Sequence, residues 1–302
     1  MIGQITIADY SSDWALKERH VAPRTSPGYL TREEVIESYG SLGIAGIELN
    51  HAYWDDYDAA RLKRLAANAG LPIVTDVALV DLAVPVVDRR SALNEIFSIL
   101  DRTAVLGASG VFLFPAIYKP EFSVPEQRAW LIENLRLAAE RAASMGITIL
   151  SENIDYPPTR VFMGRGSDCR DLCAKVDSAA FRLIYDAAAH LFVNDDPQQT
   201  FNDMFPYAQH VHLKSYRALG PDEQPERFRE SNDGKRYTGT TLDVGLVDID
   251  GIVAKLSRLN YQGFLQIEYQ GVDDPRIALK QNVAYLRGLL ARLAPASGAS
   301  HS

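Results

Sequence analysis

The chain has 302 residues, of which 47% are hydrophobic and 23% are charged, and its formal net charge is −8 at pH 7. This composition is typical of a globular protein with a large core. The negative charge, without a basic stripe, argues against a nucleic-acid partner. No apolar run approaches the roughly 18 residues that span a bilayer, and the first residues do not resemble a signal peptide. We therefore expect a cytoplasmic protein that binds neither nucleic acid nor membranes.

Short apolar runs alternate with helical patterns eight times along the chain. The apolar runs predict strands at 3–9, 43–50, 71–79, 110–116, 147–154, 181–187, 209–215 and 263–269. Predicted helices lie at 31–42, within 57–69, at 91–106, 125–145 and 168–176, within 197–204, and at 248–260 and 275–293. This alternation is typical of a (β/α)8 TIM barrel. We expect one barrel domain over residues 1–293, followed by a disordered tail at 294–302.

Capping residues and polar segments add local detail to this prediction. Thr31, followed three residues later by Glu34, predicts a capping box at the start of a helix. Ser167 is the expected cap of the helix at 168–176. Two long polar segments, 11–27 and 216–245, follow the first and seventh strands. Both are expected to be loops on the face where the strands end, and therefore walls or lids of a pocket.

Four of the predicted strands carry a metal-binding side chain at or near their end. These residues are Glu152, Asp186, His212 and Glu268. Because the strand ends of a TIM barrel meet at one face, the four side chains are expected to converge. Three acids and one histidine suit Mn²⁺, Mg²⁺, Co²⁺ or Fe²⁺ better than a structural zinc ion. Any one acid alone is better explained by a helix cap or an ion pair, but the shared position in four units favours a metal site.

The segments SENID, YDAAAH, HVHLKSY and FLQIEY occur in this order along the second half of the chain. They resemble the sugar isomerase/epimerase group of xylose-isomerase-like TIM barrels, which includes keto-sugar 3-epimerases, hydroxypyruvate isomerase and inosose dehydratase. The resemblance implies one divalent metal, with Mn²⁺ as the first choice, bound by Glu152, Asp186, His212 and Glu268. It further implies that Glu152 and Glu268 act as the catalytic acid/base pair.

Four more residues are candidates for substrate binding. The family usually has a substrate-binding histidine on the sixth strand, and His190 lies one residue further along the chain than that pattern requires. It either binds substrate from a shifted position or packs in the interior. Lys214 shares a strand face with His212 and is a candidate to contact a substrate oxygen. The resemblance also suggests substrate contacts for Arg217 and Glu48, although a polar residue such as Glu48 at a strand end is often a loop cap.

These residues suit the removal of a proton next to a carbonyl group. A metal chelated by a ketone and its neighbouring hydroxyl acidifies the carbon-bound proton and stabilises the enediolate. A carboxylate on each side of the substrate then removes a proton and returns one. Return to the same carbon from the opposite face gives an epimer, and return to the adjacent carbon gives an isomer. The expected function is therefore a divalent-metal-dependent sugar epimerase or isomerase acting on a keto-sugar.

Two alternatives remain open at this stage. A lyase, either a dehydratase or a 3-oxo-glycoside C-deglycosidase subunit, would use the same enolisation to expel a leaving group. The long segment 217–240 favours a lyase, since it could shape a site for an aglycone. The more distant alternative is a non-catalytic sugar-binding barrel. In each case the expected partner is a small-molecule sugar or sugar derivative, with a homo-oligomer or a small second subunit as further options.

Overall fold

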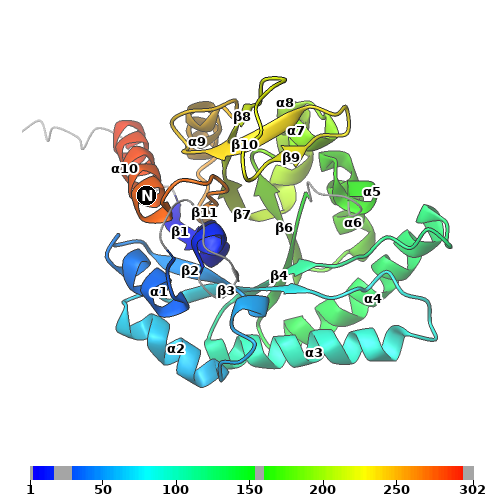
Figure 1. Cartoon of the computed structure of the whole chain (residues 1–302). Coiled ribbons are helices and arrows are strands. Elements are labelled where there is room, and N and C mark those ends of the chain that lie inside the picture. The colour runs from blue at the N-terminus through cyan, green and yellow to red at the C-terminus, as the bar shows by residue number, and fades with distance from the viewer. Residues whose placement is uncertain (1–2, 17–28, 154–159, 295–302) are drawn as a thin grey trace, which may run out of the picture.

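Eight parallel strands close into a barrel in the computed structural model, which describes residues 3–16, 29–153 and 160–294 (Figure 1). The barrel strands are β1 (Gln4–Ala8), β2 (Gly46–Asn50), β3 (Ile73–Leu79), β4 (Gly110–Phe114), β5 (Thr148–Glu152), β6 (Phe181–Asp186), β7 (Ala208–Leu213) and β11 (Phe264–Ile267). Neighbouring strands follow the closed order β1-β11-β7-β6-β5-β4-β3-β2, so each strand is paired on both sides. This topology confirms the predicted TIM barrel.

Helices follow the barrel strands and cover the outside of the barrel (Figure 1). The longer ones are α1 (Arg32–Gly40), α2 (Ala59–Asn68), α3 (Arg89–Leu106), α4 (Val124–Ser144), α6 (Gly166–Val176), α8 (Pro197–Met204), α9 (Ile249–Arg258) and α10 (Pro275–Leu293). Short helical segments are η1 (Asp9–Ala15), η3 (His51–Tyr53), α5 (Arg160–Met163), α7 (His190–Val193) and η4 (Phe205–Tyr207). Within the described parts of the chain, no helix is long and apolar enough to cross a membrane.

Of the two predicted helix caps, the one at the start of α1 is confirmed and the one at the start of α6 is wrong. Thr31 and Glu34 form the expected capping box at the start of α1, with hydrogen bonds of 3.2 and 2.7 Å. Ser167, in contrast, lies inside α6 and does not cap it. The backbone N–H of Gly166 donates instead to the carboxylate of Asp195, 3.2 Å away and far along the chain. A distant acid thus accepts from the start of α6, and no local sequence pattern reveals such a partner.

The prediction of a plain loop over residues 216–245 was also wrong. This segment forms an antiparallel sheet of β8 (Ser215–Ala218), β9 (Arg229–Glu230) and β10 (Arg236–Thr240), in the order β8-β10-β9. Figure 1 shows these strands in yellow, close to β7, from which β8 continues almost directly. Two buried tyrosines, Tyr216 and Tyr237, pack edge-on against Phe192 at 5.1 and 5.7 Å and hold the sheet on the barrel. We call these three strands the lid sheet.

A glycine allows the lid sheet to lie directly on the chain that follows β11. A Cβ atom on Gly239 of β10 would lie 2.3 Å from the backbone carbon of Gln270, which is far inside any real contact. Only glycine therefore permits this approach of two backbones. The close contact brings the lid sheet next to Gln270. This residue lies two positions after Glu268, which directly follows β11. The lid sheet is thus fixed beside the strand ends that carry the candidate site.

Strand alternation decides which side chains enter the barrel. The interior contains a small apolar cluster of Val77, Phe112, Leu150 and Ile184, each at most 2% exposed. Since side chains two residues apart on a strand share a face, Glu152 points into the barrel one step above Leu150. In the same way Asp186 follows Ile184. The apolar cluster therefore forms the floor on which the polar residues at the strand ends lie.

The packing of the barrel against its helices predicts how much individual leucines contribute to the free energy of unfolding. Leu183 on β6 is 0% exposed, whereas Leu259 at the end of α9 is 47% exposed. Leu183→Ala leaves a buried cavity and is expected to lower the free energy of unfolding by ~2–5 kcal/mol. Leu259→Ala is the matched control and is expected to stay within about 0.5 kcal/mol of the parent protein. Urea unfolding followed by circular dichroism measures both, and similar losses in the two variants would contradict the packing described.

Candidate active site

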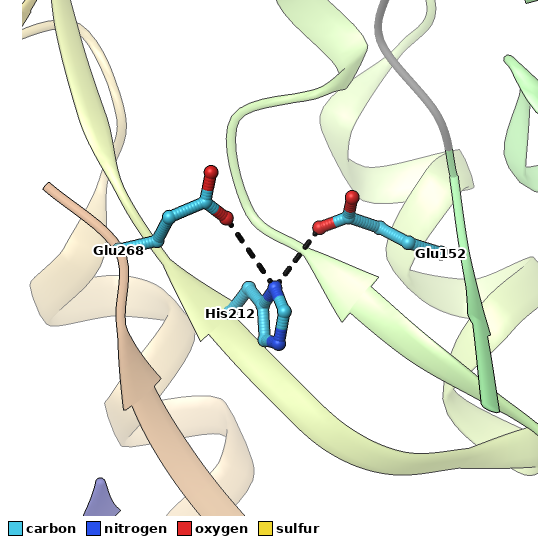
Figure 2. Close-up of side chains that lie close together, drawn as sticks. All are labelled: Glu152, His212 and Glu268. Atoms are coloured by element: carbon cyan, nitrogen blue, oxygen red, sulfur yellow. Dashed lines mark hydrogen bonds and ion pairs between the residues drawn. The ribbon is translucent and has the colours of Figure 1, made fainter. Parts of the chain in front are cut away.

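Glu152, His212 and Glu268 converge inside the barrel at the ends of β5, β7 and β11 (Figure 2). The Nδ1 atom of His212 lies 3.0 Å from Oε1 of Glu152 and 3.4 Å from Oε2 of Glu268. One possible ligand atom from each residue lies within 4.8 Å of the other two. All three side chains are buried. The tertiary structure therefore brings together three of the four residues predicted to hold a metal.

Asp186, the fourth predicted ligand, borders this group of three. It ends β6 directly beside His212 in the strand register. Its Oδ1 atom accepts backbone hydrogen bonds from Ala188 and Ala189, at 2.7 and 3.1 Å. Its Oδ2 atom forms an ion pair with the ammonium group of Lys214. The carboxylate is thus oriented by the backbone on one side and faces the site on the other.

Lys214 provides a positive charge in the middle of these acids. Its Nζ atom lies 3.3 and 3.4 Å from the two carboxylate oxygens of Glu268 and also contacts Asp186. The side chain is only 2% exposed. Lys214 follows His212 by two residues, as the predicted shared strand face requires. The structure therefore places Lys214 at the site, within reach of any group bound between Asp186 and Glu268.

The ionisation of these groups follows from burial and from their neighbours. Burial alone would lower the pKa of His212, but the carboxylates of Glu48, Glu152 and Glu268 raise it well above its usual range. Burial alone would raise the pKa of Glu268, yet Lys214 and His212 lower it overall. Burial raises the pKa of Asp186, and Lys214 opposes this increase only in part. The acids are therefore compensated by two protonated side chains, one from histidine and one from lysine.

A divalent cation fits this arrangement. Two glutamate carboxylates and one imidazole offer the mixed oxygen and nitrogen ligands that Mn²⁺, Mg²⁺ or Fe²⁺ accept. Buried carboxylates at such short separations need positive charge close by. The Nε2 atom of His212 is buried, and no residue in the described part of the chain hydrogen-bonds to it. The donor set is thus a candidate site for a divalent cation.

Glu48 lies next to the other ring nitrogen of His212. The Oε1 atom of Glu48 lies 3.7 Å from Nε2 of His212 and accepts a 2.7 Å hydrogen bond from the hydroxyl of Tyr10. The hydroxyl of Thr75 donates to its Oε2 atom. The side chain is fully buried, and burial raises its pKa. Glu48 therefore lies at ion-pair distance from the imidazole, next to the ring nitrogen that does not face Glu152 and Glu268.

Two of the predicted substrate-binding residues lie elsewhere. His190 is the first residue of α7 and lines a separate cavity of about 360 Å³ that Tyr185 and Phe201 also line. Arg217 lies on β8 with about half of its side chain exposed, and it pairs with Glu223 at 2.9 Å. Neither residue lines the cavity next to Glu152 and Glu268. The structure therefore does not bring these two side chains to the group around His212.

The cavity above the three converging residues has a volume of about 120 Å³. Three of its lining residues escaped sequence analysis, namely Arg227, Arg229 and Gln270. Arg227 binds the carboxylate of Asp13 at 2.8 and 3.3 Å, and Gln270 donates to Glu268. The spacing of the two arginines, with Phe228 between them, is the period-two sequence signal that places both side chains on one face, and in the structure both are half-buried.

These features define a TIM barrel with a candidate metal centre at the ends of its strands. The family model described as xylose isomerase-like TIM barrel matches residues 37–289. The chain therefore belongs to this family. A curated relative, 2-oxo-tetronate isomerase from Cupriavidus necator, is 23% identical over 196 residues. The match covers 64% of this chain and 65% of that relative, so it spans just under two thirds of the relative's length.

Two solved structures illustrate how widely the fold is shared. The structure of an L-ribulose 3-epimerase has a TM-score of 0.72 at 17% identity and covers 100% of both chains. The structure of the probable 3-DHS dehydratase AsbF from Bacillus anthracis has a TM-score of 0.68 at 18% identity, and the match covers 94% of this chain and 98% of that one. At these identities the likeness establishes the common barrel fold.

A second pair of buried acids lies behind Glu48. Asp9 accepts hydrogen bonds from the backbone of Asn50 at 3.0 Å and from the indole of Trp54 at 2.7 Å. Burial raises the pKa of Asp9 to about 7, despite these hydrogen bonds. Asp76 is fully buried, and burial, reinforced by Asp9, raises its pKa to about 8. Both acids therefore hold a proton over much of the neutral pH range.

Asp76 predicts a specific pH dependence of stability. Its pKa is higher in the folded chain than the ~3.9 of an unfolded aspartate, so the folded state binds the extra proton. The resulting stability is complete below pH ~4 and is lost as the pH rises towards about 8. Asp76→Asn removes this dependence. Between pH 5.5 and 8.5, the parent should lose on the order of 2 kcal/mol more than the variant in urea unfolding.

The control for this measurement is Asp101→Asn, which changes an exposed aspartate on α3 paired with Arg141. It should keep the pH dependence of the parent protein. If Asp76→Asn and the parent show the same slope with pH, the protonated state assigned to Asp76 is wrong.

Proposed function

We propose that this protein is a divalent-metal-dependent epimerase or isomerase that acts on a keto-sugar by removing a proton next to its carbonyl group. The observation that carries the proposal is the placement of Glu152 and Glu268 on two sides of the same nitrogen of His212 (Figure 2). Glu152, Asp186, His212 and Glu268 would hold the cation. Membership of a sugar-processing family supports a small sugar substrate, and the curated relative is itself named an isomerase.

The two glutamates perform the proton transfers in this proposal. A divalent cation, when bound, polarises the substrate carbonyl and acidifies the adjacent carbon-bound proton. Glu268, whose pKa is lowered by Lys214 and His212 against the effect of burial, is ionised and accepts a proton as a general base. Glu152 lies on the other side of the same ring nitrogen (Figure 2) and delivers a proton from there. Delivery to the same carbon gives the epimer, and delivery to the next carbon gives the isomer.

Other residues of the site stabilise the charge that develops and exclude water. The ammonium group of Lys214, between Asp186 and Glu268, is placed to donate a hydrogen bond to the substrate oxygen as it becomes negative. The carboxylate of Glu48 adds negative charge on the other side of the imidazole of His212. The lid sheet, fixed against Gln270, closes one wall of the cavity with Arg227 and Arg229. The site is thereby small, charged and largely shielded from solvent.

A lyase is the second candidate. Elimination needs the same first proton transfer and, in addition, a leaving group on the substrate carbon next to the enolised position. The lid sheet favours it, since Arg227 and Arg229 line the cavity and are able to stabilise a departing anion. The two functions share the first proton transfer and differ in the product. An eliminated fragment in the reaction mixture supports the lyase, and an epimer or isomer supports the first proposal.

Metal binding is tested without any assay of activity. Calorimetric titration of Mn²⁺ into protein stripped with EDTA is expected to show one site per chain. Glu152→Gln and Asp186→Asn each replace the carboxylate of a candidate metal ligand by a neutral amide. Each should weaken Mn²⁺ binding by at least ~10–100-fold. Glu140→Gln, which changes an exposed glutamate on α4, should leave binding unchanged. Equal binding by all four proteins, or none by the parent, would exclude this metal centre.

Proton abstraction is tested by deuterium exchange. The Mn²⁺-loaded protein is mixed with a panel of keto-sugars and 3-oxo-glucosides in D₂O, and the carbon-bound proton is followed by NMR. Exchange should depend on metal and disappear with EDTA. Glu268→Gln and Glu152→Gln should each reduce it by at least ~100-fold, since a positioned acid or base contributes that much. Glu140→Gln is again the control, and full exchange in both site variants would refute the assigned roles.

A further inference from the structure

A second and larger cavity adjoins the cavity above the candidate metal centre. It has a volume of about 660 Å³ and lies between the ends of β2 and β3 and helix α3. Asn50, Val77 and Phe114 line both cavities. Phe114 packs on Phe112 with ring centres 4.6 Å apart, and Phe112 in turn contacts the ring of His212 at 5.4 Å. A continuous wall therefore connects the larger cavity to the candidate metal centre.

The sizes of the two cavities indicate how a substrate would divide between them. The cavity above Glu152 and Glu268 has only about 120 Å³, well below the ~300–1,000 Å³ typical of small-molecule sites. The adjoining cavity, at about 660 Å³, lies within that range. The smaller cavity has room for the reacting carbons, while most of the available volume lies beyond Phe114. A substrate that fills the site therefore extends into the larger cavity.

The lining of the larger cavity is suited to a hydroxylated ring. Ile99, Val77 and Phe114 provide an apolar surface, while Ser98 and Arg102 are among the polar residues contributed by α3. The remaining polar residues are Asn50, His51 and Glu95. Donors and acceptors are thus mixed, which is what hydroxyl groups require because each one both donates and accepts. A sugar ring combines such hydroxyls with apolar C–H faces that pack on an aromatic ring.

A buried aspartate supports the polar side of this cavity from behind. The Oδ2 atom of Asp76 lies 3.8 Å from Nε of Arg102 and 4.0 Å from Nδ1 of His51, and these two side chains contact each other. The chain after β2 is also held in place, because the side chain of Asn50 accepts a 3.1 Å hydrogen bond from the backbone of Ala52. Arg102 and His51 therefore hold each other in position before any ligand arrives, as a preformed site requires.

We propose that this second cavity binds a second sugar ring of the substrate, so that the natural substrate is a glycoside of disaccharide size and not a free monosaccharide. The keto-sugar unit reacts between Glu152 and Glu268, and the attached ring lies between Phe114 and α3. This inference rests on the proposed function for the position of the reacting unit. The cavity itself, its volume and its lining are independent of the chemistry.

The test compares the binding of two ketoses, D-fructose and isomaltulose, in which a glucosyl ring is attached to fructose. Isothermal titration of each sugar into the full-length Mn²⁺-loaded protein is expected to show at least tenfold tighter binding of isomaltulose. Ser98→Trp, which places an indole in the cavity from an exposed position on α3, should abolish this preference and leave the affinity for fructose unchanged. Ser144→Trp, an exposed position on α4, should bind both sugars like the parent.

Each result decides the inference. Equal affinities for the two sugars in the parent protein, or no binding of either sugar, overturn it, and this comparison does not depend on the folding of a variant. A preference that persists in Ser98→Trp also overturns it. Arg102→Met provides a second variant, which is expected to weaken the binding of isomaltulose and not that of fructose.

Deuterium exchange is recorded separately. A preference for binding the disaccharide without exchange supports the second sugar-binding cavity and refutes the proposed chemistry. Equal kcat/KM for exchange of both sugars refutes the second sugar-binding cavity and keeps the proposed chemistry.

Discussion

The burial of several carboxylates around one histidine is the constraint on which the site depends. Glu48, Glu152 and Glu268 all lie within 3.7 Å of a nitrogen of His212, in a part of the barrel that water scarcely reaches. Such a group is stable only with positive charge in its midst. A protonated His212 and the ammonium of Lys214 supply that charge here, and a divalent cation bound to His212 would supply it in place of the imidazole proton. The same requirement makes the cluster a candidate site for a divalent cation.

The barrel gives this cluster its geometry and its surroundings. Alternation along each strand places Leu150 and Ile184 on the floor of the interior and sends Glu152 and Asp186 upward from it. The lid sheet, admitted by Gly239, closes one side. A substrate also needs an open route to the cluster, and the larger cavity, which begins beyond Phe114, offers one. A small reacting chamber and a larger adjoining cavity are thus parts of one strand-end surface, which is the general place of active sites in this fold.

Sequence reasoning succeeded where a residue's position on a strand determines its direction. The four candidate ligands end or nearly end apolar runs, and Lys214 stands two residues beyond His212, so period-two alternation alone aims them all inward. The direction of a side chain was harder to predict beyond the barrel strands. His190 and Arg217 were assigned by analogy with a motif and its spacing, but His190 faces the cavity beside α8 and Arg217 pairs with Glu223 on the lid sheet. Both residues lie beyond the barrel strands, on α7 and β8, where the alternation of a barrel strand no longer determines their direction.

The sequence by itself determined the barrel, the order of its strands and the set of acids and the histidine at their ends, because these follow from local periodicity and from the rule that parallel strands end at one face. Only the tertiary structure decided which of these groups touch, and hence their charges. It also decided that a polar segment folds into a lid sheet, since burial of Tyr216 and Tyr237 against Phe192 outweighs the polar sequence around them. The second cavity is likewise a tertiary feature, because strands β2 to β4 and helix α3 form it jointly.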